Sequence, residues 1–159
     1  MKSLILPLLL AVVAICSGCT TVPAIPDNYS GPIATIYDSA MSETSNRAQF
    51  YYLGEFDGKR LDNVLVKTRQ QNAGRGFSLA TAQYSRQVPA GLHQLKLQAR
   101  IGYGAPIQEM LNSSTLYSIE RTISVTLESN KTYVVNGTLS ADEKAVWIEE
   151  SVTGERIEP

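Results

Sequence analysis

The sequence predicts an all-β protein whose folded part is one antiparallel sandwich of about seven or eight strands. Short apolar runs with strand-like alternation recur from residue 33 to the end of the chain, and turn-forming residues separate them. No long helical pattern lies between these runs, which argues against a βαβ fold. We therefore expect a sandwich of the immunoglobulin-like or prealbumin-like type over residues 33–159.

The N-terminal segment predicts export from the cytoplasm. One positive charge at Lys2 precedes an uncharged apolar run from Leu4 to Ile15. This run of about a dozen residues is shorter than the roughly 20 that a membrane-spanning helix needs. The pattern is that of a signal peptide, which we expect to cover residues 1–18.

The residues Cys16-Ser17-Gly18-Cys19 resemble the bacterial lipobox, in which two small residues precede an obligatory cysteine. Cys16 stands where that motif usually has Leu. The resemblance implies cleavage after Gly18 and attachment of a diacylglyceryl lipid, with palmitate-type acyl chains, to the thiol of Cys19. Both cysteines of the chain lie here, so the exported domain has no disulfide. The alternative is an ordinary secretory signal with two incidental cysteines.

Residues 19–32 are expected to form the lipid anchor and a Pro-rich tether. The prolines Pro23, Pro26 and Pro32 disfavour regular structure, and thirteen residues at ~3.1 Å each reach at most about 40 Å. The part of the chain that remains after cleavage suits a single domain, which we place at residues 33–159.

Strands are predicted in order along this domain. Residues 49–56 form a strand with Phe50, Tyr52 and Phe56 on one face, and Asp57-Gly58 is a tight turn. The segment 61–66 is either a strand or a short helix, and 70–76 is a loop. The remaining predicted strands are 33–37, 77–88, 92–101, 119–127, 132–139 and 145–152.

The strand at 92–101 has the clearest alternation, with Leu95, Leu97, Ala99 and Ile101 on one face. After it, residues 102–115 read as a long loop with one helical turn at 107–111, and loops of this length carry function more often than strands do. A turn at 129–131 contains Asn130, which tolerates left-handed geometry. Trp147 is expected to be at least partly buried.

Charge is distributed unevenly along the chain. Residues 59–86 hold six basic residues and the single acid Asp62, whereas residues 139–159 hold six acids and two basic residues. The functional interpretation is a binding surface for phosphate groups, made of Lys67, Arg69 and Arg75 with Tyr103 from the long loop. The alternative, which we favour, is that the two segments face each other or are simply solvated.

The sequence gives no sign of catalysis. It lacks a Gly-x-Ser-x-Gly elbow, a Walker loop and a His-Glu-x-x-His stretch, so we expect no catalytic residues, no metal and no cofactor besides the lipid on Cys19. His93, the only histidine, is expected to be structural, with a ring nitrogen bonded to the backbone. A mature formal charge of −2 argues against a nucleic-acid partner.

Three motifs carry a family resemblance: the glycine turn and strand of 88–97, the turn into a Tyr-bearing strand of 125–133, and the Thr-Gly hairpin that closes 147–154. Together they resemble a family of small, largely uncharacterised proteobacterial lipoproteins, similar to PEGA-type surface β-domains. The resemblance covers most of the mature chain and implies a β-domain in the cell envelope. It brings no catalytic residues.

The leading hypothesis is a non-enzymatic lipoprotein whose β-domain binds an envelope protein, a glycan or lipopolysaccharide. Thr20 follows the modified cysteine, which in enteric-type bacteria resembles a signal for the outer membrane, and we expect a periplasm-facing location there. Two alternatives stay open. One is an envelope enzyme that uses scattered carboxylates such as Asp57 and Glu55, and the other is an abundant structural coat lipoprotein.

Overall fold

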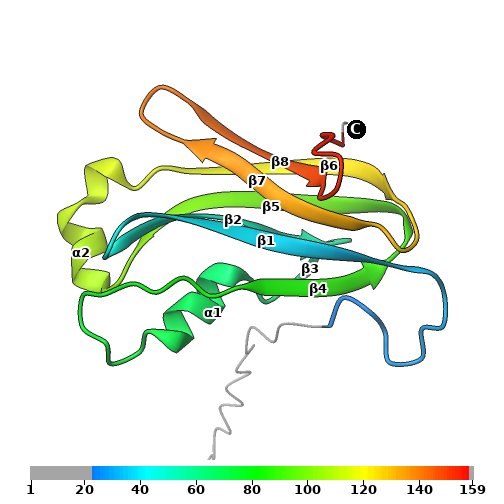
Figure 1. Cartoon of the computed structure of the whole chain (residues 1–159), viewed down its shortest axis with the longest axis horizontal. Helices are drawn as coiled ribbons and strands as arrows, with labels where there is room; N and C mark the ends of the chain where they lie inside the picture. The colour runs from blue at the N-terminus through cyan, green and yellow to red at the C-terminus, as the bar shows by residue number, and fades with distance from the viewer. Residues whose placement is uncertain (1–22, 158–159) are drawn as a thin grey trace, which may run out of the picture.

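The computed structural model describes residues 23–157, so the predicted signal peptide and Cys19 lie outside the described part. This part is mostly β, with eight strands, two α-helices and one 3-10 turn (Figure 1). In chain order the elements are β1 (Ile33–Thr44), β2 (Arg47–Phe56), β3 (Lys59–Arg60), α1 (Val64–Gln71), β4 (Tyr84–Pro89), β5 (Gly91–Tyr103), α2 (Pro106–Leu111), the 3-10 turn Ser113–Thr115, β6 (Ser118–Leu127), β7 (Thr132–Leu139) and β8 (Lys144–Glu150).

All eight strands belong to one mixed sheet with the order β6-β5-β2-β1-β7-β8, to which β3 adds by pairing with β2 and β4 by pairing with β1. The long strand β1 changes partners along its length. Its first half pairs with β4 antiparallel and with β7 parallel, and its second half pairs with β2. The sheet curls so that β8 packs across β5 and β6. The prediction of a single antiparallel sandwich is therefore wrong. Strand β1 belongs to both halves of the curled sheet and pairs in parallel with β7.

The main core lies inside this curled sheet. It is built from the inward-facing residues of seven strands, among them Ile36, Leu53, Leu97, Val135 and Ile148, which are fully buried. Burial of each such side chain contributes about 1.5–3 kcal/mol. The predicted inward face of the 92–101 strand is confirmed, because Leu95, Leu97, Ala99 and Ile101 are all buried in it.

A second, smaller core lies outside the sheet. Phe50 and Tyr52 of β2 pack there against Val64 and Leu65 of α1. Strand β2 is therefore buried on both faces, since Tyr51 and Leu53 point into the main core. The segment for which both a strand and a helix were open is thus the start of a helix, and α1 covers the outer face of β2.

A β-bulge overturns one predicted face of β2. The register against β5 shifts between Leu53 and Glu55, which places one extra residue, Gly54, in the strand. The extra residue reverses the alternation, so Phe56 turns into the main core while Phe50 and Tyr52 face α1. These three aromatic residues do not share a face as predicted.

Other local predictions fare unequally. The tight turn at Asp57-Gly58 is confirmed, with φ of 49° and 74°, and so is left-handed Asn130 with φ of 61°. Trp147 is partly buried, as expected. The strand predicted for 77–88 is shorter, since β4 begins only at Tyr84. Within residues 23–157 no helix is long and apolar enough to cross a membrane.

Candidate binding site

A cavity of about 480 Å³ opens at the end of the molecule where α1 finishes and α2 begins. Arg69 and Tyr103, two of the four residues predicted to form a binding surface, both line it. The other lining residues come from the loop after α1 and from the approach to α2: Asn72, Ala73, Gly74, Gly76, Leu79, Gly104, Ala105, Pro106 and Glu109. The long loop that the sequence marked as a functional candidate thus forms one wall.

Helix α1 is held in place at its first turn. The side chain of Asn63 caps the helix by accepting a hydrogen bond from the backbone N–H of Val66 at 3.1 Å. The buried carboxylate of Asp38 accepts a second one from the N–H of Val64 at 2.9 Å. With Val64 and Leu65 packed on β2, the helix directs Arg69 toward the cavity.

The loop after α1 is tied back onto the helix by two polar side chains. Buried Asn72 exchanges hydrogen bonds with the backbone of Ala80 at 2.7 and 2.9 Å, and the hydroxyl of Thr68 accepts from the N–H of Ala82 at 2.9 Å. Between these fixed points, Gly74 and Gly76 adopt φ of 80° and 68°, which glycine tolerates without strain. Arg75 is exposed between the two glycines.

Gly104 lets this loop cross the start of the α2 segment. A β-carbon at Gly104 would lie 2.3 Å from the carbonyl oxygen of Phe77 and 2.8 Å from that of Ser78. Any larger residue would therefore push the loop away and alter the cavity. The sequence showed a Gly-Tyr-Gly run here but gave no sign that it served a close contact between backbones.

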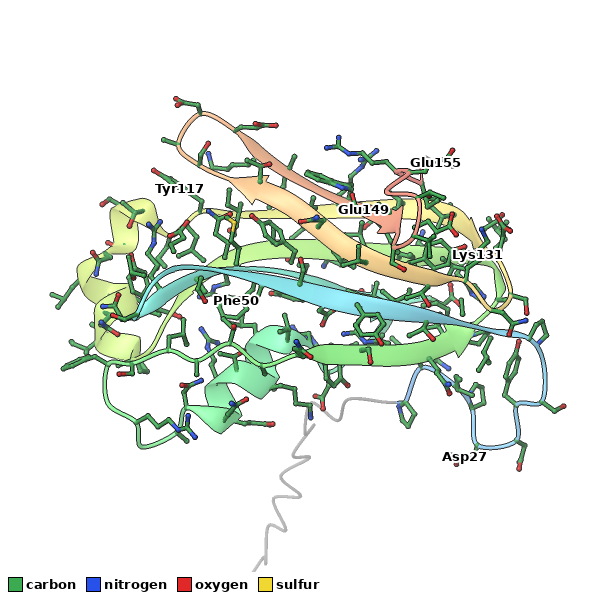
Figure 2. The ribbon with its side chains drawn as sticks, in the orientation of Figure 1. Asp27, Phe50, Tyr117, Lys131, Glu149 and Glu155 are labelled. Carbon is green, nitrogen blue, oxygen red and sulfur yellow. The ribbon has the colours of Figure 1, made fainter. Side chains whose placement is uncertain are left out.

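Helix α2 exposes an apolar face instead of burying it. Ile107, Met110 and Leu111 follow the spacing of one helical face, yet they are 47%, 72% and 78% exposed. Phe77, on the loop that crosses Gly104, is 61% exposed. Figure 2 shows side chains of α2 projecting outward from the end of the molecule. We call these four residues the apolar end; sequence reasoning missed them, although the predicted helical turn at 107–111 contained three of them.

Glu109 attaches α2 to the rest of the domain. Its carboxylate pairs with Arg69 of α1 at 2.7 Å and with Arg100 of β5 at 3.4 Å, and only 17% of its side chain is exposed. No residue of α2 is buried, so packing contributes little to its position. The guanidinium of Arg69 is therefore already occupied by a carboxylate at the cavity wall.

Lys67 and Arg75 stand apart from this cavity lining. The ammonium of Lys67 pairs with Asp62 at 2.7 Å and lies 5.6 Å from the ring centre of Tyr84. The predicted surface of three converging basic residues thus does not form around one ligand position. Of the two forms of the favoured alternative, the one in which the basic and acidic segments face each other is wrong: α1 lies on one side of the sheet, whereas Glu149 and Glu155 lie on the other (Figure 2). The form in which both segments are simply solvated stays a prediction.

The scattered carboxylates named for an enzyme are engaged in local contacts. Asp57 bonds to Nδ1 of His93 at 2.8 Å and accepts from the N–H of Gln94 at 2.9 Å. Glu55 pairs with Lys96 at 3.4 Å. The ring nitrogen of His93 thus contacts a carboxylate rather than the backbone, which corrects our expectation. The described residues include no group of three or more His, Cys, Asp or Glu side chains placed to hold a metal ion.

Comparison of the chain with known protein families, with curated proteins and with solved structures finds no match. The resemblance to small lipoproteins with PEGA-type domains stays a prediction, and what this domain does must be inferred from its own residues.

Proposed function

We propose that this chain is a lipoprotein of the bacterial outer membrane, anchored through Cys19 and facing the periplasm, whose β-domain binds a protein partner without catalysing a reaction. The observation that carries the binding role is the apolar end beside the cavity. Monomeric soluble proteins rarely leave contiguous large apolar side chains in water without a use for them. A partner that covered them would gain about 1.5–3 kcal/mol for each fully buried side chain.

The chemistry of the cavity favours a protein over a phosphate-bearing glycan. Arg69 already has Glu109 as its partner, so a phosphate would have to displace a carboxylate. The exposed apolar side chains next to it instead suit an apolar anchor residue from another protein, inserted into the 480 Å³ cavity. Lipopolysaccharide remains the alternative ligand that the experiment below separates.

The binding proposal is tested by photo-crosslinking in the native envelope. A photoreactive amino acid that replaces Met110 should crosslink to one defined protein. Val152 provides the matched control, since it is an 85% exposed apolar residue far along the chain from the apolar end. Equal crosslinking from both positions, or crosslinks to lipopolysaccharide alone, would overturn a protein-binding role for this end.

The anchor is tested separately. The Cys19→Ala chain should take up no labelled fatty acid and should accumulate as unprocessed precursor, because the thiol that receives the lipid is gone. Metabolic labelling followed by immunoprecipitation measures this. Density-gradient fractionation of the unaltered protein should place it with the outer membrane. Undiminished label on the Cys19→Ala protein would refute the anchor, and recovery only in the inner membrane would refute the location.

A further inference from the structure

The segment expected to be a free tether is partly bound to the domain. Pro23, Ala24 and Ile25 border a groove whose other wall includes Leu61 and Tyr84. Ala24 packs against the main core, and Ala24 and Ile25 are half-buried. The chain therefore reaches the domain at Pro23, ten residues before β1 begins at Ile33. A tether of thirteen free residues overestimates how far the domain can stand from its anchor.

The chain between Cys19 and Pro23, the first described residue, is short. Four residue steps separate Cys19 from Pro23, and a fully extended chain covers at most about 3.6 Å per step. Whatever conformation those residues take, Pro23 lies within about 14 Å of a lipidated Cys19. The surface of the domain around Pro23 is thus held close to the membrane.

Helix α1 begins at that surface. Asp62, which lines the same groove as Pro23, precedes the helix and bonds to the ammonium of Lys67 at 2.7 Å. Figure 1 shows α1 and β4 together on one side of the sheet and the β7–β8 hairpin on the other. Of all the faces of the domain, the α1 side is the one that a short anchor brings nearest to lipid.

Charge favours the same orientation. Residues 61–82 carry Lys67, Arg69 and Arg75 against the single acid Asp62. The opposite side carries the acids Asp142, Glu143, Glu149 and Glu155 against the basic residues Lys144 and Arg156, on the β7–β8 hairpin and the chain end. Anionic phospholipid attracts basic side chains that come within about a Debye length, roughly 8 Å at physiological ionic strength, and repels acidic ones.

We infer that the α1 side of the domain lies against the anionic phospholipid surface into which the acyl chains of Cys19 insert, with the acidic β7–β8 side turned away. This inference rests on the proposed lipid anchor. The occupant of the surface is a phospholipid bilayer, since the three basic residues are spread along the side instead of converging on one ligand. Ion pairing offsets two of these charges, Lys67 with Asp62 and Arg69 with Glu109, each at 2.7 Å. The net positive charge of residues 61–82 is therefore that of Arg75, which has no ion-pair partner among the described residues.

The test uses the full lipidated protein in vesicles of phosphatidylethanolamine and phosphatidylglycerol. No cysteine follows Cys19 in the sequence, and the thiol of Cys19 carries the lipid, so a fluorophore can be placed at a single new thiol. The two labelled positions are Gln71→Cys on the exposed part of α1 and Asp142→Cys on the β7–β8 hairpin. A nitroxide on the lipid headgroups should quench the Gln71→Cys label several-fold more strongly. Equal quenching, or stronger quenching at position 142, would overturn the orientation.

Two further measurements distinguish a failure of the anchor from a failure of the orientation or of its electrostatic cause. Failure of the labelled protein to float with the vesicles overturns the anchor itself, whereas flotation with equal quenching overturns the orientation alone. Adding Lys67→Gln and Arg75→Gln should weaken quenching of the Gln71→Cys label in vesicles that contain phosphatidylglycerol, and the control Lys144→Gln on the opposite side should not. An equal effect of Lys144→Gln would contradict the charge argument.

Discussion

Asp38 is the residue on which several elements of the domain meet. Its carboxylate accepts hydrogen bonds from the N–H of Leu53 at 3.0 Å and of Val64 at 2.9 Å, and it pairs with Arg86. Arg86 in turn donates to the carbonyl of Leu53 at 3.0 Å. One buried side chain of β1 thereby connects β2, α1 and β4, and the last two of these elements form the α1 side of the domain.

Burial makes Asp38 sensitive to pH. Removal from water raises the pKa of Asp38 to about 6, although Arg86 and the two backbone donors lower it. In the unfolded chain the pKa returns to about 4, so between those two values the folded state holds the proton more tightly. The free energy of unfolding should therefore fall, by up to about 3 kcal/mol from this group, as pH rises from 4 to 6.

Urea unfolding at a series of pH values measures this dependence. The double variant Asp38→Asn/Arg86→Met has neither charge, so comparison with it isolates the contribution of the pair. The difference in stability between the two proteins should change across pH 4 to 6 and stay level from pH 7 to 8. A difference that is level throughout would show that Asp38 keeps its ordinary pKa in the fold.

The sequence offered no way to find Asp38. It follows a predicted strand as one of fifteen acids, and its partners Leu53, Val64 and Arg86 are 15, 26 and 48 residues away. A buried ion pair of this kind depends on which strands become neighbours, and local alternation does not encode that. The charge of Arg86 was noticed only as part of a basic segment.

At the scale of the element, α2 has an unusual mode of attachment. A six-residue helix is too short to be stable alone, and this one has no buried residue. Glu109 should therefore decide whether it stays folded against Arg69 and Arg100. Glu109→Gln is expected to speed amide hydrogen exchange over residues 106–111 while lowering global stability by only about 1 kcal/mol or less.

Hydrogen exchange followed by mass spectrometry provides the measurement. Glu143→Gln, which removes a charge from the turn between β7 and β8, is the matched control and should leave exchange over 106–111 unchanged. If Glu109→Gln left this exchange as slow as in the unaltered chain, the two ion pairs would not be what holds α2.

Elements were predicted well where the pattern was local and poorly where it was not. Alternation located β5, because this strand buries one face and leaves the other partly exposed, and the turn at 129–131 located the start of β7. The predicted strand 77–88 failed at its first half, where Asn72 and Thr68 bind the backbone of Ala80 and Ala82 and keep it beside α1. Hydrogen bonds from side chains to the backbone of residues further along the chain produce no periodic pattern in the sequence.

Only part of the candidate site could be predicted from the sequence, for the same reason. Arg69 and Tyr103 were selected from charge and from loop position, and both line the cavity. The exposure of Met110 and Leu111 was not predictable, since apolar residues at helical spacing usually indicate a buried face. Only the arrangement of neighbouring elements shows that nothing in the described domain covers them.

At the scale of the whole molecule, β1 explains why the predicted class was right and the predicted architecture wrong. The polar second half of β1, residues 38–44, lacks a clear apolar alternation, so the strand was predicted to stop at Tyr37. Its continuation to Thr44 is what lets one strand pair with β4 and β7 first and with β2 afterwards. A parallel pairing across about 100 residues has no local signature.

The position of β1 also determines how the domain would carry mechanical load between a membrane anchor and a bound partner. Pulling on a lipid-anchored Cys19 would first detach residues 23–32 from the domain, a segment whose fully extended length is about 35 Å. It would then reach β1 at Ile33, at the end of the long axis opposite α2 (Figure 1). There the hydrogen bonds to β4 and to β7 are loaded in shear on both edges and must break together. With the proposed anchor and partner in place, residues 23–32 would extend first, and β1, paired on both edges, would resist further extension.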